Sequence, residues 1–75
     1  MSRGVQEALE LLSRFKMCWP ELQWRLCIER GVSLTLNELD ALIKTMLKMK
    51  AVELFDDPYK VIKDIVITEK GRGMI

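Results

Sequence analysis

The chain has 75 residues, the length of one small domain, which is too short for most doubly wound α/β enzymes or barrels. Hydrophobic residues make up 49% and charged residues 31%, a balance typical of a folded globular chain. There are 12 basic and 11 acidic residues, so the net charge of +1 excludes a strongly basic, histone-like binder. It does not exclude a nucleic-acid module whose basic side chains gather on one face.

The sequence contains no histidine, which excludes serine–histidine catalysis, cysteine–histidine catalysis and zinc sites with a histidine ligand. It also lacks GxSxG and Walker motifs, so we expect no enzyme activity, cofactor or metal. The two cysteines, Cys18 and Cys27, are too few for a disulfide framework and lie too far apart along the expected second helix to pair. We expect reduced thiols in a cytoplasmic protein without a signal peptide or membrane span.

Two helices are predicted in the first part of the chain. Apolar residues at intervals of three and four predict the first, over residues 4–16. Leu11 lies at the edge of its stripe and fits either extra core or a partner contact. The second is expected over residues 20–30, because Pro20 suits the first helical position and Gly31 the C-terminal cap. Residues 21–28 also alternate like a strand, but their composition favours a helix. The stripe of the first helix comprises Val5, Ala8, Leu9, Leu12 and Phe15.

The third helix has the clearest start. Thr35 and Glu38 have the spacing of a capping box, in which the hydroxyl accepts from the Glu38 amide and the carboxylate reaches back. The helix should end near Lys50, where its last lysines face the negative end of the helix dipole. With Leu42 beside it, the apolar stripe consists of Leu36, Leu39, Ile43, Met46 and Leu47.

After the third helix the apolar period changes to two, which predicts a β-hairpin. Val52, Leu54 and Phe55 begin a strand, and residues 56–58, Asp-Asp-Pro, form a turn signal. Residues 61–67 are rich in β-branched side chains and are expected to form the returning strand. Thr68 then caps a short last turn before Gly71.

This order of elements resembles that of winged helix-turn-helix domains. Residues 42–53 resemble a recognition helix that runs into the first wing strand, with Lys50-Ala51 where glycine is commonest in such domains. Residues 65–72, Ile-Val-Ile-Thr-Glu-Lys-Gly-Arg, resemble the end of the wing in small MarR- and PadR-like transcriptional regulators. The resemblance implies one α+β domain over residues 1–75, with a three-helix core followed by a two-stranded wing.

One face of the third helix, opposite its apolar stripe, is expected to read the major groove of DNA. Asparagine can pair with adenine, lysine can reach guanine or phosphate, and alanine or threonine can touch the thymine methyl group. The alternative is that this face only contacts solvent, with Asp40 and Lys44 forming an ordinary ion pair. Glu38 and Asp40 also oppose phosphate contact. The expected reading face consists of Asn37, Ala41, Lys44, Thr45 and Lys48.

Four more basic residues complete the predicted interface. Arg25 and Arg30 would contact the DNA backbone from the second helix, and Lys60 and Lys63 from the wing. Each of them also fits a plain solvated charge. The acidic residues 56 and 57 at the expected wing tip would repel phosphates, so the wing is an imperfect DNA contact.

Large aromatic side chains leave a second function open. One of Trp19 and Trp24 should anchor the core against the first helix, while the other is partly exposed at an interface. Tyr59 beside the turn fits either core cover or a contact with DNA.

The sequence therefore predicts a transcription regulator that binds double-stranded DNA. The alternative is a winged-helix module that binds protein without DNA, which the near-neutral charge and the acidic wing tip favour. Regulators of this kind usually act as dimers. Because the dimerisation helices of MarR-like proteins are missing, a homodimer would have to use the first helix or the C-terminus.

Overall fold

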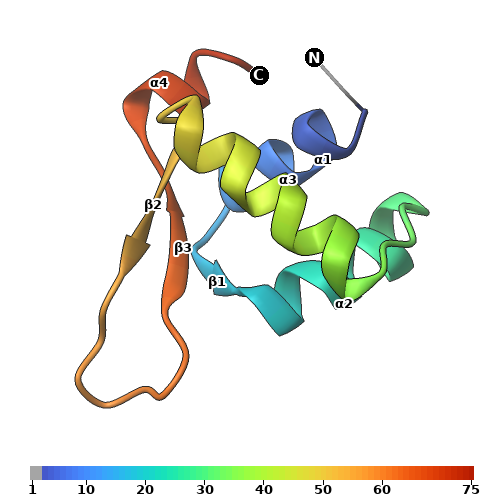
Figure 1. The fold of residues 1–75 in the computed structure, drawn as a ribbon. Helices are drawn as coiled ribbons and strands as arrows, with labels where there is room; N and C mark the ends of the chain where they lie inside the picture. The colour runs from blue at the N-terminus through green and yellow to red at the C-terminus, as the bar shows by residue number, and fades with distance from the viewer. Residues whose placement is uncertain (1–2) are drawn as a thin grey trace.

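The structure, a computed structural model, describes residues 3–75 (Figure 1). Three helices come first, with one short strand among them: α1 (Arg3–Leu12), β1 (Met17–Cys18), α2 (Trp19–Arg30) and α3 (Leu36–Lys48). The strands β2 (Val52–Phe55) and β3 (Asp64–Ile67) follow, and the chain ends in the short helix α4 (Glu69–Arg72). The loop between β2 and β3 extends away from the helices as the tip of a wing (Figure 1).

The sheet has three antiparallel strands in the order β1-β3-β2, so the expectation of a two-stranded hairpin was incomplete. Ile65 in the central strand lies opposite Met17 on one side and Leu54 on the other. A strand of two residues is too short to show an apolar period, which is why the sequence did not reveal β1. Its pairing fixes the base of the wing to the segment between α1 and α2.

The returning strand is shorter than predicted. It begins at Asp64 rather than at Val61, because residues 56–63 form the wing loop instead of extending the ladder. Val61 is fully exposed and Ile62 is 39% exposed, so these β-branched residues project from the loop. Tyr59 is 95% exposed and does not cover the core.

The core lies where the three long helices meet the sheet. α1 contributes one complete face, and Leu11, at 2% exposure, belongs to it, so the interpretation of this residue as extra core is confirmed. Met46 of α3 is fully buried as expected. The other main core side chains come from every layer: Val5, Leu9, Leu12, Met17, Leu22, Leu26, Leu39, Val52, Ile65 and Ile67.

α1 ends four residues earlier than predicted. The hydroxyl of Ser13 donates to the carbonyl of Glu10 at 2.6 Å, a local bond of the kind that competes with helix propagation. Phe15 therefore leaves the helical stripe and is 45% exposed instead of joining the core. Leu36, in the first turn of α3, is also outside the core at 61% exposure.

The prediction that one tryptophan anchors the core was wrong, since Trp19 is 38% and Trp24 58% exposed. Leucines fill the space instead. α2 is a helix as predicted, with Gly31 in the left-handed conformation at its C-cap. Its strand-like alternation arises because Leu22 and Leu26 face the core while apolar residues also lie on the opposite, exposed face.

The predicted capping box of α3 is confirmed. The Glu38 amide donates to the Thr35 hydroxyl at 3.2 Å, and the Thr35 amide donates to the Glu38 carboxylate at 2.9 Å. These bonds satisfy two of the amides that a helix start leaves unpaired. They fix the residue at which α3 begins, and with it the position of Asn37.

Acid is expected to weaken this start of α3. The bond from the Thr35 backbone, followed by that from its side chain, holds the pKa of Glu38 below its usual 4.5. A carboxyl group whose pKa is lower in the folded state stabilises the fold above its unfolded pKa, and this contribution is lost as the pH falls through the folded pKa. Urea unfolding from about pH 5 downwards should therefore show a smaller loss of stability for Glu38→Gln than for the wild type. An identical pH dependence of the two proteins would contradict this assignment.

Hydrogen bonds from Thr68, near the C-terminus, hold the turn after α3. Lys50 has a φ of 59°, in the left-handed region that favours glycine. The hydroxyl of Thr68 donates to the Lys50 carbonyl at 2.7 Å, and the Thr68 amide donates to the Ala51 carbonyl at 2.9 Å. The same hydroxyl accepts from the Gly71 amide at 3.1 Å, which confirms Thr68 as the cap of the last turn. Thr68 thus joins α3, the wing and α4.

Candidate nucleic-acid interface

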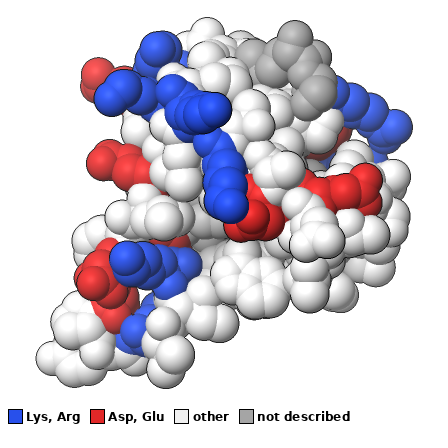
Figure 2. Space-filling model, in the orientation of Figure 1, with Lys and Arg blue, Asp and Glu red and all other residues white. Residues whose placement is uncertain are grey.

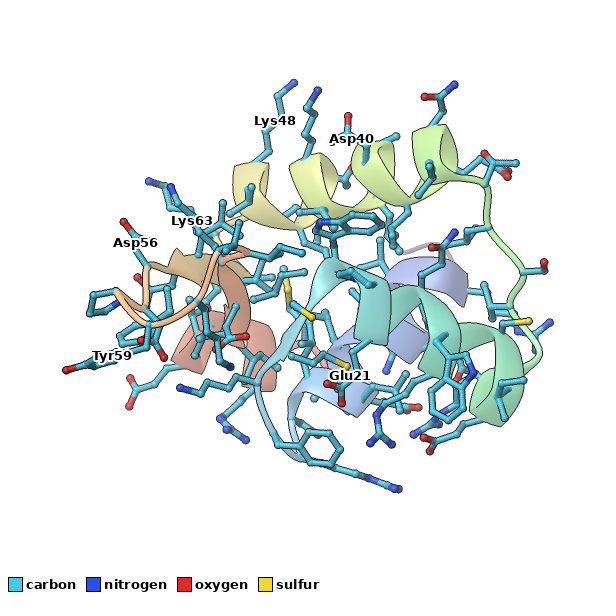
Figure 3. The ribbon with its side chains drawn as sticks, turned by 90° about the horizontal axis from the view of Figure 1, so that it is seen from below. Glu21, Asp40, Lys48, Asp56, Tyr59 and Lys63 are labelled. Atoms are coloured by element: carbon cyan, nitrogen blue, oxygen red, sulfur yellow. The ribbon has the colours of Figure 1, made fainter. Side chains whose placement is uncertain are left out.

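The predicted reading face of α3 is exposed along its whole length. Asn37, Ala41, Lys44, Thr45 and Lys48 are all exposed, while Leu39 and Met46 on the other side of the helix are buried. The face points out of the molecule in Figure 3, where Lys48 and Asp40 project from the same side of the helix. This arrangement follows from the apolar stripe, which anchors α3 to the core and turns its polar side to solvent.

The two lysines on this face differ in whether they form an ion pair. Lys44 forms an ion pair with Asp40, with 2.9 Å between the ammonium nitrogen and the carboxylate oxygen, and both side chains are exposed. Exposed pairs of this kind are worth little, so Asp40 holds Lys44 only weakly. Lys48 has no ion pair with any residue in the range 3–75. The Thr45 hydroxyl donates to the Ala41 carbonyl at 2.9 Å.

The wing brings one further lysine to the same side. Lys63 is exposed and projects in the same direction as Lys48 (Figure 3). The space-filling view shows lysine and arginine side chains over α3 and over the wing, with acidic side chains between them (Figure 2). Asp56 in the same wing loop is also exposed, so the charge of the wing is mixed rather than uniformly positive.

Lys60, in contrast, is used within the protein. Its ammonium group donates to Asp64 at 3.0 Å, and this hydrogen bond, followed by the charge of Asp64, raises the pKa of Lys60. Asp64 is only 2% exposed, and Lys16 approaches its carboxylate to 3.8 Å. The two lysines therefore neutralise a buried carboxylate at the base of the wing, and the half-exposed ammonium group of Lys60 is paired within its own chain.

Replacing Asp64 by asparagine is expected to lower the free energy of unfolding by about 2 kcal/mol, the usual contribution of a hydrogen bond to a charged group. The loss stays moderate because Lys16 and Lys60 are half exposed and keep their hydration. Urea unfolding measures it, with Glu53→Gln, an exposed change in β2, as the control expected to stay within about 0.5 kcal/mol. Equal stability of the two variants would contradict the role of Asp64 as an anchor.

The two arginines of α2 are also held by carboxylates. Arg25 lies between Glu21 at 2.9 Å and Glu29 at 2.6 Å, and these hydrogen bonds, that of Glu21 first, raise the pKa of its guanidinium group. Glu21 projects from the side of the molecule opposite to Lys48 (Figure 3). The structure therefore does not bring Arg25 together with the α3 face.

Arg30 connects α2 to α1. Its guanidinium group donates to Glu7 at 3.2 Å and to Glu10 at 2.9 Å, and Arg3 donates to its carbonyl at 3.1 Å. These contacts occupy Arg30 inside the helical layer. Their signal in the sequence is the spacing of Glu7 and Glu10, which places both carboxylates on one side of α1.

An apolar groove next to the α3 face was not predicted. It has a volume of about 590 Å³ and lies between α3 and the wing. Trp19 and Leu39 line it together with Leu54 of β2. The charged residues Asp40 and Lys63 also line it. The sequence signal was the set of apolar residues that fell outside the core, among them Leu36, Leu54 and Val61. We call this hollow the α3–wing groove.

Across residues 3–75 no helix combines the length and the apolar character needed to span a bilayer. The same residues contain no cluster of three or more cysteine, aspartate or glutamate side chains able to hold a metal ion. Cys18 and Cys27 are free thiols.

Comparison with known proteins identifies the architecture. No family model matches the chain, and a search of curated proteins finds no relative. Among solved structures, the crystal structure of a candidate transcriptional regulator from Thermoplasma acidophilum matches it with a TM-score of 0.77. The match covers 95% of this chain and 70% of the other, at 23% sequence identity. The chain has a winged-helix fold.

In this winged helix, α2 and α3 form the helix-turn-helix pair and β2 with β3 forms the wing. The α+β class and the order of elements expected from the sequence are confirmed. Because no family model matches, the narrower resemblance to MarR- and PadR-like regulators has no support beyond the fold.

Proposed function

We propose that this winged helix binds double-stranded DNA and regulates transcription, with α3 in the major groove. The observation that carries the proposal is the exposure of Asn37, Lys44 and Lys48 along one side of α3, with Lys63 of the wing projecting to the same side (Figure 3). Helix-turn-helix proteins place such a face against base edges, and a wing lysine then reaches the neighbouring phosphates. The description of the Thermoplasma acidophilum neighbour as a regulator supports the same function.

The proposed interface is smaller than the sequence suggested. We leave out Arg25, Arg30 and Lys60 because carboxylates that are partly or fully buried hold them, whereas the pair of Lys44 with Asp40 is exposed. Base contacts are assigned to Asn37, Ala41 and Thr45, and phosphate contacts to the lysines. The remaining set is Asn37, Ala41, Lys44, Thr45, Lys48 and Lys63.

Fluorescence anisotropy with a labelled random-sequence duplex tests the proposal. About three phosphate contacts, from Lys44, Lys48 and Lys63, predict that log Kobs falls against log salt with a slope of roughly −2.7. Binding should be strongest near 50 mM salt, where non-specific contacts are least screened. Absence of binding at about 50 mM salt, or binding independent of salt, would contradict the proposal.

A protein-interaction role is the second candidate. Trp24 and Ile28 lie one turn apart on the outer face of α2 and are 58% and 64% exposed. Neighbouring exposed apolar side chains of this size are typical of protein interfaces. This candidate becomes the leading one if the duplex does not bind.

A further inference from the structure

The α3 face carries two small side chains between its charged ones. Ala41 and Thr45 are both exposed and lie one helical turn apart, where Cβ atoms are about 5–6 Å from each other. Neither residue lines the α3–wing groove, so the wing loop does not cover them. The two side chains therefore form a short, accessible strip on the surface that the proposed function turns towards DNA. We call it the Ala41–Thr45 strip.

The hydroxyl group of Thr45 is engaged within the helix. It donates its one proton to the Ala41 carbonyl, four residues earlier, at 2.9 Å. A bond of this kind holds the hydroxyl branch of the side chain against the helix backbone. Thr45 therefore has no proton left to donate to a base, and it offers a methyl group together with the lone pairs of its oxygen.

The methyl group of Ala41 completes the strip, which presents two methyl groups and no free donor. Among the groups that base pairs expose in the major groove, only the 5-methyl group of thymine is apolar, and the others donate or accept hydrogen bonds. A donor or acceptor placed against two methyl groups would lose its hydration without gaining a partner, which is unfavourable. A thymine methyl group in the same place is removed from water, which is favourable.

We propose that Ala41 and Thr45 select duplexes with a thymine at this place in the site, through contact of the thymine methyl group with their own. The proposal rests on the proposed function, because it requires α3 in the major groove. A methyl group seated over the strip can touch both side chains at roughly 4 Å, the distance of an ordinary apolar contact. The phosphate contacts assigned to the lysines carry no sequence information, so the strip adds a preference that those contacts lack.

Exchange of thymine for uracil tests the contact, because it removes only the methyl group and leaves base pairing unchanged. A duplex is selected from a random library by binding to the full chain. Each thymidine in it is then replaced, one at a time, by deoxyuridine, and affinity is measured by fluorescence anisotropy at about 50 mM salt. We expect one position at which the exchange weakens binding about fourfold, the effect of exposing one methyl-sized group. Exchange of thymidines in the flanking sequence is the control and should leave the affinity unchanged.

Two variants of Thr45 distinguish its methyl group from its hydroxyl oxygen. Thr45→Val keeps the methyl group, so the effect of uracil should stay near fourfold, about the value of one buried methyl group. Thr45→Ser keeps the hydroxyl and loses the methyl group, so the effect of uracil should fall below about twofold. Thr45 is exposed and lies outside the core, so both variants should fold, which circular dichroism checks.

The outcomes separate this proposal from the proposed function. If a duplex binds but no exchange of thymine for uracil changes its affinity, the methyl contact is wrong and DNA binding stands. An effect of uracil that persists in Thr45→Ser and disappears in Thr45→Val would assign the contact to the hydroxyl oxygen and overturn the proposal. An equal effect in the wild type and both variants would also overturn it, since the thymine methyl group would then lie against another residue. If no duplex binds at about 50 mM salt, the proposed function fails and this proposal fails with it.

Discussion

Replacing Gly71 by alanine is expected to lower the free energy of unfolding by about 3 kcal/mol or more, from overpacking plus a lost hydrogen bond. A Cβ atom at this position would collide with the carbonyl oxygen of Ala51 and lie 2.8 Å from Cγ1 of Ile67. The carbonyl is backbone, so it cannot rotate away as a flexible side chain would. Either α4 or the Ala51 turn must move.

The collision affects more than one contact because the Ala51 carbonyl also accepts from the Thr68 amide at 2.9 Å. Displacement of the turn would strain this bond and those of the Thr68 hydroxyl to Lys50 and Gly71. For a domain of this size each kcal/mol corresponds to about 4–8 °C, so the melting temperature should fall by roughly 12–24 °C.

Gly73→Ala provides the matched control. Gly73 is exposed with a φ of −71°, and a Cβ there would make only ordinary contacts, 3.5 Å from the Lys70 carbonyl oxygen. Calorimetry should show a change within about 0.5 kcal/mol for this variant. If the Gly71→Ala and Gly73→Ala variants have the same melting temperature, the close approach of α4 to the Ala51 turn is not a structural requirement.

Removing the two unpaired lysines of the α3 face should give the largest functional effect. Lys48→Ala combined with Lys63→Ala is expected to make the salt slope of duplex binding shallower by about 1.8, which is 0.9 for each lost phosphate contact. At about 50 mM salt the affinity should fall at least tenfold. Both side chains are exposed and form no ion pair among the described residues, so stability should be unaffected.

The control for this variant removes the same charge elsewhere. Arg14→Ala with Lys70→Ala deletes two exposed basic residues outside α3 and the wing. If the long-range field of the whole protein controlled binding, both double variants would lose equal affinity. A specific α3 contact predicts that the slope changes only when Lys48 and Lys63 are removed.

Local rules explain why much of the fold was predictable. The capping box at Thr35 and Glu38 and the cap at Thr68 depend on residues three apart, so sequence spacing reveals them. Gly71 belongs to the stretch that resembled the end of a wing, and the structure supplies its reason: only a hydrogen atom fits against Ala51.

The errors concern contacts between distant segments. The large apolar side chains of Trp19 and Trp24 suit a core, but leucine side chains occupy the core and both tryptophans are exposed. β1 exists only because β3 returns beside it more than 40 residues later. The length of the returning strand was overestimated because β-branched residues in the wing loop look like a strand when only the local sequence is considered.

In the candidate site too, local features were predictable from the sequence and contacts between distant segments were not. The exposed face of α3 was predicted, since helical periodicity alone separates it from the apolar stripe. The partners of Arg30 and Lys60 were not, because Glu7 and Glu10 lie on another helix and Asp64 was expected inside a longer strand. The pairs of Arg30 and Lys60 involve partly buried or buried carboxylates, whereas the pair of Lys44 with Asp40 is exposed, and only the tertiary structure reveals this difference.

An NMR titration of the ¹⁵N-labelled chain with a short duplex tests DNA binding through α3, since it locates the contact residue by residue. We expect the amide shifts to concentrate between residues 37 and 48 of α3 and around Lys63, with the outer face of α2 unchanged. Shifts confined to Trp24 and Ile28, or no shifts in α3 at a saturating duplex concentration, would contradict DNA binding through this helix.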